Sequence, residues 1–233
     1  MTRLFITGDT HGELSMKKLS NKNWSTGRDL TKDDVVIIAG DFGLLFDPVQ
    51  SPAEEYWLKW LESKQWTTCF VDGNHENFDL LEHLPVVDKF NGKVGKVSDS
   101  VYHLRRGEVY TIADKKILTF GGAESIDKAN RKEFITWWRQ EIPSYQEFDK
   151  AAESIQKNPE VDLIISHTCP TDIANQLLAI LGNNYKNIND PTSKMLDTII
   201  SSVKFQDHYF GHWHIDRDIG KHHALYYRII EVL

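Results

Sequence analysis

The most informative segment of the sequence is Leu4-Phe5-Ile6-Thr7-Gly8-Asp9-Thr10-His11-Gly12. Its first residues are apolar and favour a β-strand, which we expect over residues 3–8. Directly after that strand, Asp9 and His11 form a compact pair of metal-ligand side chains. The flanking glycines let the backbone turn tightly beside the pair. Taken alone, an Asp-x-His pair is a weak signal that a surface turn explains better, so its meaning depends on the rest of the chain.

The same arrangement returns several times further along the chain. Each time, an apolar strand-like run is followed by polar side chains that can bind metals, in most cases with a glycine close by. These further residues are Asp41, Asn74, His75, His167, His212 and His214. Because the carboxyl ends of parallel strands open onto one crevice, we expect these side chains to converge there.

The first third of the chain predicts alternating strands and helices. We expect strands at residues 35–39 and 67–71, a short amphipathic helix at 14–19 and a longer helix at 51–65. The run at 35–39 is apolar throughout, as in a strand that is covered on both faces. The longer helix begins with an N-cap Ser51 followed by proline and two glutamates. This β-α-β-α-β order predicts parallel strands with right-handed crossovers.

The remainder of the chain predicts a less regular alternation. Three short apolar runs at 101–104, 108–112 and 116–120 predict an antiparallel meander, and an irregular segment follows at about 121–145. Helices are expected at 146–156, 173–181 and 193–203, with an Asn-rich loop between the last two, and strands at 161–165, 206–210 and 224–233. No repeat or linker is visible, so we expect a single domain over residues 1–233.

Composition narrows the class of protein. The net charge is −7 and no stripe of Lys and Arg is present, which disfavours binding to long nucleic acid but leaves a small nucleotide open. The two cysteines form no CxxC pattern, so a reduced, cytoplasmic setting is expected. The sequence contains no apolar run that would span a membrane and no signal-peptide pattern, and we expect no membrane partner.

The candidate ligands suit a pair of metal ions. Two Asp, one Asn and four His are too many for one ion and fit two ions that share a carboxylate; they are Asp9, His11, Asp41, Asn74, His167, His212 and His214. Oxygen and imidazole ligands without thiolate suit manganese, iron, zinc, cobalt or nickel. Two such ions about 3.5–4 Å apart can hold a phosphate ester and activate a water for in-line attack. They also place positive charge where the transition state gathers negative charge.

These residues carry a resemblance to a known family. Asp9-x-His11, Gly40-Asp41, Gly73-Asn74-His75-Glu76, His167 and Gly211-His212-x-His214 resemble, in the same order, the five-block signature of the calcineurin-like metallophosphoesterases. The resemblance covers nearly the whole chain. It implies a four-layer α/β/β/α sandwich with mixed sheets and a dinuclear metal site at the carboxyl ends of strands.

The resemblance also implies a role for each residue. Asp9, His11 and His214 would hold one ion, and Asn74, His167 and His212 the other. Asp41 would bridge them. His75 would not be a ligand but would donate to the phosphate or protonate the leaving oxygen.

The activity implied by the resemblance is metal-dependent hydrolysis of a small phosphoester by a metal-bound hydroxide, with manganese as the first choice of metal. Two alternatives remain open. One is a phosphodiesterase or nuclease acting on nucleotides. The other is a scaffold that has the fold without catalysis, which the presence of every ligand and of His75 disfavours. The oligomeric state is left open.

The chain departs from the protein Ser/Thr phosphatase branch of this family. Leu44 and Leu45 stand where that branch has Asp and Arg, and Asp72 stands where it has a second Arg. The arginines with which that branch grips phosphate are therefore absent, so we do not expect a protein phosphatase of that type. Arg131 could bind the substrate phosphate in their place, although a surface or salt-bridged arginine is the default interpretation. Either Asp47 or Asp72 could orient His75, and the sequence does not decide between them.

Overall fold

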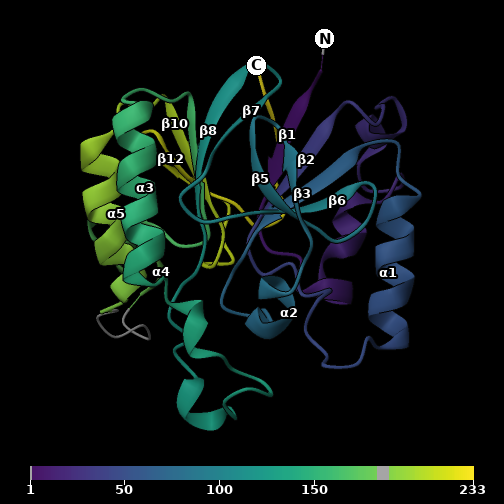
Figure 1. Cartoon of the computed structure of the whole chain (residues 1–233), viewed down its shortest axis with the longest axis horizontal. Helices are drawn as coiled ribbons and strands as arrows, with labels where there is room; N and C mark the ends of the chain where they lie inside the picture. The colour runs from purple at the N-terminus through teal and green to yellow at the C-terminus, as the bar shows by residue number, and fades with distance from the viewer. Residues whose placement is uncertain (1, 183–188) are drawn as a thin grey trace.

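The computed structural model describes residues 2–182 and 189–233, so part of the predicted Asn-rich loop lies outside the described residues. Two β-sheets pack face to face, and helices cover the outer face of each sheet (Figure 1). Within the described residues one sheet has seven strands and the other six. The predicted four-layer α/β/β/α sandwich with mixed sheets is confirmed.

The seven-stranded sheet has the strand order β13-β1-β2-β3-β6-β5-β4. Its strands are β1 (Leu4–Thr7), β2 (Val35–Ala39), β3 (Thr67–Val71), β4 (Val86–Lys89), β5 (Gly92–Lys96), β6 (Val101–Leu104) and β13 (Ile229–Val232). Strands β1, β2, β3 and β6 run parallel, which confirms the parallel pairing predicted for the first three. The chain therefore leaves these strands at one edge of the sheet.

The six-stranded sheet has the order β11-β12-β10-β9-β8-β7. Its strands are β7 (Val109–Ile112), β8 (Lys115–Phe120), β9 (Leu163–Ser166), β10 (Asp207–Phe210), β11 (Arg217–Ile219) and β12 (His222–Ala224). Strands β8, β9, β10 and β12 run parallel, and β7 and β11 are antiparallel edges. Strands β9 and β10 lead directly into His167 and His212.

Three apolar layers hold the sheets and helices together. Alternate residues of β2 illustrate this arrangement: Val35 and Ile37 join the core between the two sheets, whereas Val36 and Ile38 face the helices outside. All five residues of β2 are buried. The uninterrupted apolar run thus belongs to a strand covered on both faces, as predicted.

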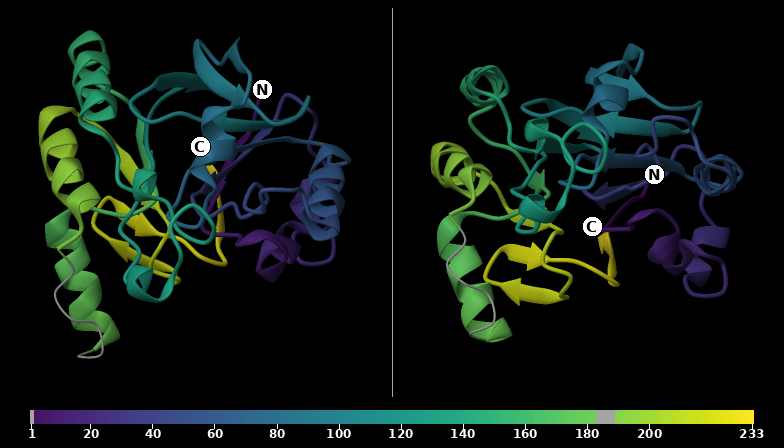
Figure 2. Two further views of the ribbon diagram at one scale, coloured as in Figure 1. Left: turned by 60° about the horizontal axis from the view of Figure 1, so that its bottom comes forward. Right: turned by 90° about the horizontal axis from the view of Figure 1, so that it is seen from below.

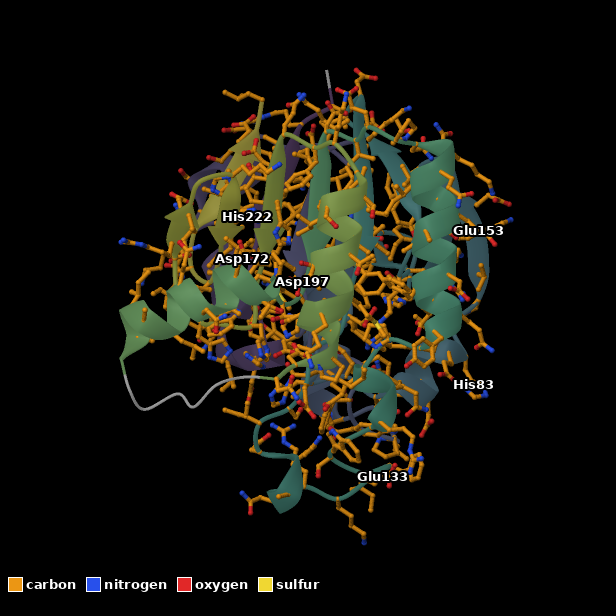
Figure 3. The ribbon with its side chains drawn as sticks, turned by 90° about the vertical axis from the view of Figure 1, so that its left-hand side faces the viewer. His83, Glu133, Glu153, Asp172, Asp197 and His222 are labelled. Atoms are coloured by element: carbon orange, nitrogen blue, oxygen red, sulfur yellow. The ribbon has the colours of Figure 1, made fainter. Side chains whose placement is uncertain are left out.

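The helices form the two outer layers. On the seven-stranded sheet lie α1 (Pro52–Glu62) and α2 (Phe78–Glu82), together with the short 3-10 turns η1 (Gly12–Leu14), η2 (Met16–Leu19) and η3 (Ser25–Arg28). On the six-stranded sheet lie α3 (Tyr145–Lys157), α4 (Thr171–Leu181) and α5 (Pro191–Ser202). Figure 2 shows the two layers on opposite sides, and Figure 3 looks onto the second, with Glu153 on α3, Asp172 on α4 and Asp197 on α5.

Among residues 2–182 and 189–233, none of the helices combines the length and apolar character that crossing a bilayer requires.

The predicted antiparallel meander is wrong. Strand β6 pairs in parallel with β3 in the seven-stranded sheet, and β7 and β8 form a hairpin in the other sheet. The chain crosses between the sheets around Arg105 and Gly107, where glycine adopts a φ of 74°. A connection of this length serves a hairpin and a crossing between packed sheets equally well. Strands β4 and β5 were not predicted from the sequence.

Two further predictions fail in detail. The helix expected at 14–19 is a pair of 3-10 turns, because Ser15 breaks the helical backbone between them with φ −123° and ψ −2°. The strand expected at 224–233 is divided into β12 and β13, which lie in different sheets. The chain turns between them where the Asp216 carboxylate accepts the backbone N–H groups of Tyr226, Tyr227 and Arg228.

The segment at 121–145 has little regular structure: before α3 begins it contains the 3-10 turns η4 (Lys128–Asn130) and η5 (Arg139–Glu141) and an isolated β-bridge between Glu133 and Trp137. It projects at the bottom of Figure 1, and Figure 3 labels Glu133 within it. Trp138 anchors it, since its buried indole donates to Asp79 at 2.9 Å. The segment is therefore tied to the fold at its base.

Candidate metal centre

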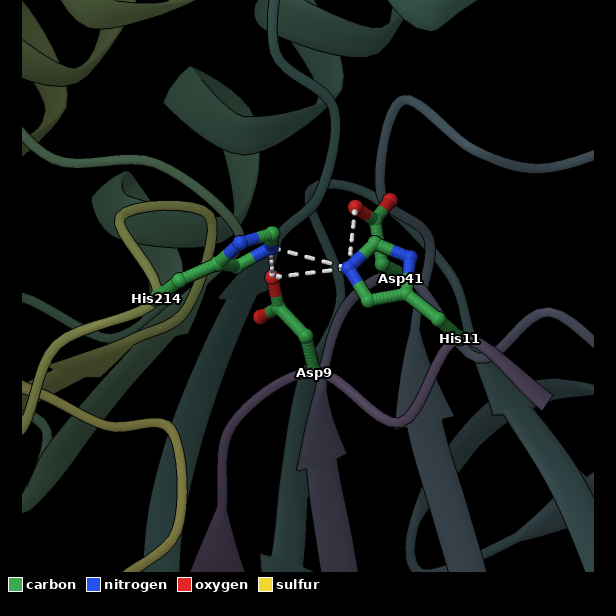
Figure 4. Close-up of side chains that lie close together, drawn as sticks. All are labelled: Asp9, His11, Asp41 and His214. Carbon is green, nitrogen blue, oxygen red and sulfur yellow. Dashed lines mark hydrogen bonds and ion pairs between the residues drawn. The ribbon is translucent and has the colours of Figure 1, made fainter. Parts of the chain in front are cut away.

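The first group of ligand-type side chains lies where β1, β2 and β10 end (Figure 4). One ligand atom from each of Asp9, His11, Asp41 and His214 lies within 4.8 Å of all the others. The Nε2 atoms of His11 and His214 are 2.8 Å apart, and Asp9 Oδ2 is 3.1 Å from the second. Two imidazole nitrogens and two carboxylates facing one point is the donor set of a divalent cation.

The second group lies beside the first. Asn74 Oδ1 is 3.0 Å from His167 Nε2 and 3.0 Å from His212 Nδ1. Asp41 belongs to both groups, because its Oδ1 is 3.4 Å from His167 Nε2 and its Oδ2 is 3.6 Å from His11 Nε2. The structure thus brings all seven sequence-predicted ligands together, with Asp41 in the middle.

Backbone amides from distant segments fix the two carboxylates. The N–H of His212 donates to Asp9 Oδ1 at 2.9 Å, and the N–H of His75 donates to Asp41 Oδ1 at 2.8 Å. Each contact joins a segment that carries a carboxylate to a later segment that carries a histidine. The geometry of the centre is therefore set by the packing of these loops against one another.

Two glycines are required by these close approaches. A Cβ atom on Gly73 would lie 2.0 Å from Asp41 Oδ1, and one on Gly211 would lie 1.9 Å from Asp9 Oδ1. Both distances are far inside van der Waals contact, so a side chain at either position would displace a carboxylate. This is the physical reason for glycine directly before Asn74 and before His212.

Four of the candidate ligands adopt left-handed backbone conformations. Their φ values are 45° for His11, 45° for Asp41, 66° for His212 and 49° for His214. Such conformations are uncommon for residues other than glycine and cost on the order of 1–3 kcal/mol each. Strain of this kind gathers at functional sites, where the surrounding structure enforces it.

The electrostatics of the centre call for positive charge. Burial acts to raise the pKa of Asp41, but the charge and hydrogen bond of His167 hold that pKa well below its ordinary value. Burial acts to lower the pKa of His167, and Asp41 instead raises it to about 10. Asp9 and Asp41 are almost fully buried, and ionised carboxylates in such a place need cations beside them. The donor set and its charge therefore fit divalent metal ions.

His75 lies outside both ligand groups, in a cavity of about 570 Å³ that reaches them. The Arg131 guanidinium lies along its ring, with nitrogen distances of 3.0 and 3.1 Å, and also pairs with Asp127 at 2.8 Å. Burial lowers the pKa of His75; Asp41 acts against that effect, and Arg131 reinforces it. The sequence-predicted Arg131 is thus both salt-bridged and part of the cavity wall.

A second cavity, of about 290 Å³, adjoins the first. The two share His11, Leu14 and His75 in their walls and so meet there. The rest of the first cavity's wall combines candidate ligands and the charged Asp127 and Arg131 with apolar side chains such as Ile126 and Trp213. The space beside His75 therefore extends in two directions.

Asp47 and Asp72 were the two aspartates that could orient His75, and the structure shows that Asp72 has other partners. The carboxylate of Asp72 is engaged by Arg106 at 2.6 Å and by His103 at 3.0 Å. Burial acts to raise the pKa of Asp72, but the charge of Arg106 and the hydrogen bond with His103 hold that pKa below its ordinary value. Asp72 is therefore a structural anchor, whereas Asp47 is exposed and lines the second cavity together with His75.

Sequence reasoning missed two residues that support the centre. Lys18 is buried, and its ammonium donates to the carbonyls of Gly8 and Asp9 at 2.8 Å each. Glu76 is fully buried and accepts the Phe42 N–H at 2.7 Å, which joins the loop after β2 to the loop after β3. Lys is ordinarily exposed, so no pattern in the sequence marks Lys18. Glu76 belongs to the third sequence block, but the sequence assigned it no role.

Comparison with known protein families gives a match to one family model. The model for calcineurin-like phosphoesterases matches residues 2–216, which include every candidate ligand from Asp9 to His214. Comparison with curated proteins gives no match. Members of this family are in general hydrolases of phosphoesters, and the cluster of ligand-type side chains agrees with a metal-dependent reaction. With the match extending over nearly its whole length, the chain belongs to the calcineurin-like phosphoesterase family.

Proposed function

We propose that the protein hydrolyses a small phosphoester with the help of two divalent metal ions. Asp9, His11 and His214 would hold one ion, and Asn74, His167 and His212 the other, with Asp41 shared. The observation that carries this proposal is the position of Asp41, whose two oxygens face two separate groups of ligand atoms.

Bound ions would supply positive charge for the phosphate oxygens and an activated water. The donor set favours manganese, with iron, zinc, cobalt or nickel as alternatives. Cys69 and Cys169 are buried free thiols outside both ligand groups, which supports a centre without thiolate and our proposal of a cytoplasmic setting.

Two side chains of the cavity would act on the substrate. His75 projects into the cavity and can donate to a phosphate oxygen or to the leaving oxygen. Arg131 lies beside it and can hold the phosphate through its planar guanidinium. Both residues would work from the side of the phosphate that faces away from the ligand groups.

A phosphodiester is the second candidate substrate, and one observation favours it. Because the two cavities meet at His75, a phosphate placed there would have room for a substituent on each side. The second cavity is lined by the carboxylates of Glu13 and Asp47, which suit a substituent without negative charge. A nucleic acid strand is disfavoured, because its phosphates would be repelled by these carboxylates and by the net charge of −7.

The test is hydrolysis of p-nitrophenyl phosphate and of bis(p-nitrophenyl) phosphate with each of the five metals. We expect turnover that Mn²⁺ stimulates and a chelator abolishes, and two ions per chain by elemental analysis. Turnover of neither compound with any metal would favour the non-catalytic scaffold instead.

A further inference from the structure

The side-chain amide of Asn74 can face the centre in two ways. Its oxygen and nitrogen ends have nearly the same shape, but only the oxygen can bind a cation. In the structure the oxygen faces His167 and His212, and the nitrogen donates to Ser125 Oγ at 3.0 Å. The opposite orientation would point N–H groups at the imidazoles and would satisfy them without any ion. Something must therefore select the orientation that binds metal.

The surroundings of Ser125 provide that selection. Its hydroxyl donates to Glu141 Oε2 at 2.6 Å, and its backbone N–H donates to Glu141 Oε1 at 2.9 Å. A carboxylate can only accept, so the hydroxyl hydrogen is committed to Glu141 and a lone pair faces Asn74. Only the nitrogen end of the Asn74 amide fits against that lone pair.

All three residues are removed from solvent, with Asn74 5%, Ser125 2% and Glu141 0% exposed. Water therefore cannot substitute for either contact. Ser125 and Glu141 both belong to the irregular segment at 121–145, which the rest of the fold does not require for its sheets. The segment reaches back to a ligand through this pair.

We propose that Glu141, acting through Ser125, is a positioning residue that keeps the oxygen of Asn74 directed at the second ion. The inference rests on the proposed function, because it assumes that Asn74 is a ligand. It goes beyond that function in assigning a role to a buried carboxylate that touches neither ion nor substrate. Partners of this kind typically contribute 10–100-fold to metal affinity, on the order of the effect expected here.

The experiment measures Mn²⁺ binding by calorimetry in Glu141→Gln. The glutamine would place an N–H₂ group against Ser125 Oγ, which would turn the hydroxyl hydrogen toward Asn74 and reverse the preferred amide. We expect the first ion to bind as in the wild type and the affinity for the second to fall about 10–100-fold. Glu62→Gln is the matched control, since Glu62 also accepts a serine hydroxyl, from Ser98, and a serine backbone N–H, from Ser100. It lines neither cavity and should bind both ions normally.

A second background separates orientation from mere packing. Aspartate at position 74 has two oxygens, so either orientation presents an oxygen to the ion. In the Asn74→Asp background, Glu141→Gln should therefore leave the affinity for the second ion unchanged or raise it. The inference would be overturned if Glu141→Gln lowered the affinity for the second ion equally in both backgrounds, or if it did not lower that affinity when Asn74 is present. If Glu141→Gln does not fold, Ser125→Ala is compared in the same two backgrounds with the same expectation. A wild type that takes up no second ion would defeat the proposed function as well, whereas two tightly bound ions with an indifferent Glu141→Gln would defeat only this inference.

Discussion

His75 and Asn74 are neighbours in the chain, yet their side chains go to different places. The amide of Asn74 enters the second ligand group, whereas the ring of His75 lies in the cavity beside Arg131. A bound phosphate would bring negative charge next to the ring and favour its protonated form. In the proposed function, His75 would therefore give a proton to the leaving group without holding metal.

We therefore expect His75→Ala to keep both ions and lose most turnover. A positioned general acid contributes about 10²–10⁴-fold, and the loss should be smaller for p-nitrophenyl esters, whose leaving group hardly needs a proton, than for alkyl esters. Turnover numbers on both ester types and metal content by elemental analysis check this. An equal loss of turnover on the two esters would indicate that His75 acts only through its charge. Loss of an ion would indicate that His75 is a metal ligand.

Arg131 is expected to contribute through the substrate phosphate. Arg131→Ala should lower kcat/KM by about 10–100-fold, the size of a hydrogen bond to a charged group, and Arg131→Lys should recover only part of it because lysine lacks the planar fork. Arg139→Ala is the matched control: it lies in the same segment, its side chain is 70% exposed, and it pairs with Glu133. Similar losses in Arg131→Ala and Arg139→Ala would assign the effect to the segment and not to phosphate binding.

At the scale of secondary structure, the sequence predicted most where the signal is local. The apolar run of β2 and the capping residues of α1 act within a few positions, so the pattern marks them directly. Likewise, Asp9 and His212 follow their strands at once, which made the convergence of the ligands predictable. The transfer from β6 to β7 was not predictable, because it depends on which sheet offers a free edge. Lys18 and Glu141 were missed because their partners lie 9, 10 and 16 positions away in irregular segments, where no helix or strand period links them.

Helix α1 gives a prediction of its own, because its first turn forms part of the wall of the second cavity. Ala53→Phe should fill that cavity and lower kcat/KM for a diester at least about 10-fold, while a monoester that needs only the first cavity stays within about 2-fold. The reason is loss of space for one substituent, a difference of about 1.4 kcal/mol or more for a tenfold effect. Ala152→Phe on α3 is the matched control, exposed and outside both cavities. Equal effects on diester and monoester would remove the reason for preferring a diester.

For the whole molecule, the centre joins segments from both sheets and leaves two carboxylates buried in it. An ion that binds only the folded state adds RT ln(1 + [L]/Kd), about 2.7 kcal/mol at a free concentration of 100 Kd. For a chain of this size that corresponds to a rise in Tm of about 2–4 °C per kcal/mol. We expect Mn²⁺ to raise Tm accordingly, as measured by calorimetric melting with and without chelator.

Asp41→Asn should lose most of this rise, because it removes the charge shared by both ligand groups. Asp88→Asn removes an exposed carboxylate that pairs with Lys93, and should melt like the wild type under both conditions. A wild-type Tm that is the same with and without Mn²⁺ would contradict the proposed dinuclear centre.

The spread of the ligands along the chain has a consequence for biosynthesis. Asp9 leaves the ribosome before the other candidate ligands, and His212 and His214 are the last two of the seven to follow. At about 5–20 residues per second, roughly 10–40 s pass between Asp9 and His214. Each ligand group contains one of these late histidines, so neither can be complete on a nascent chain that has yet to place β10. An ion that binds a complete ligand group would therefore be taken up only after His212 and His214 have been synthesised.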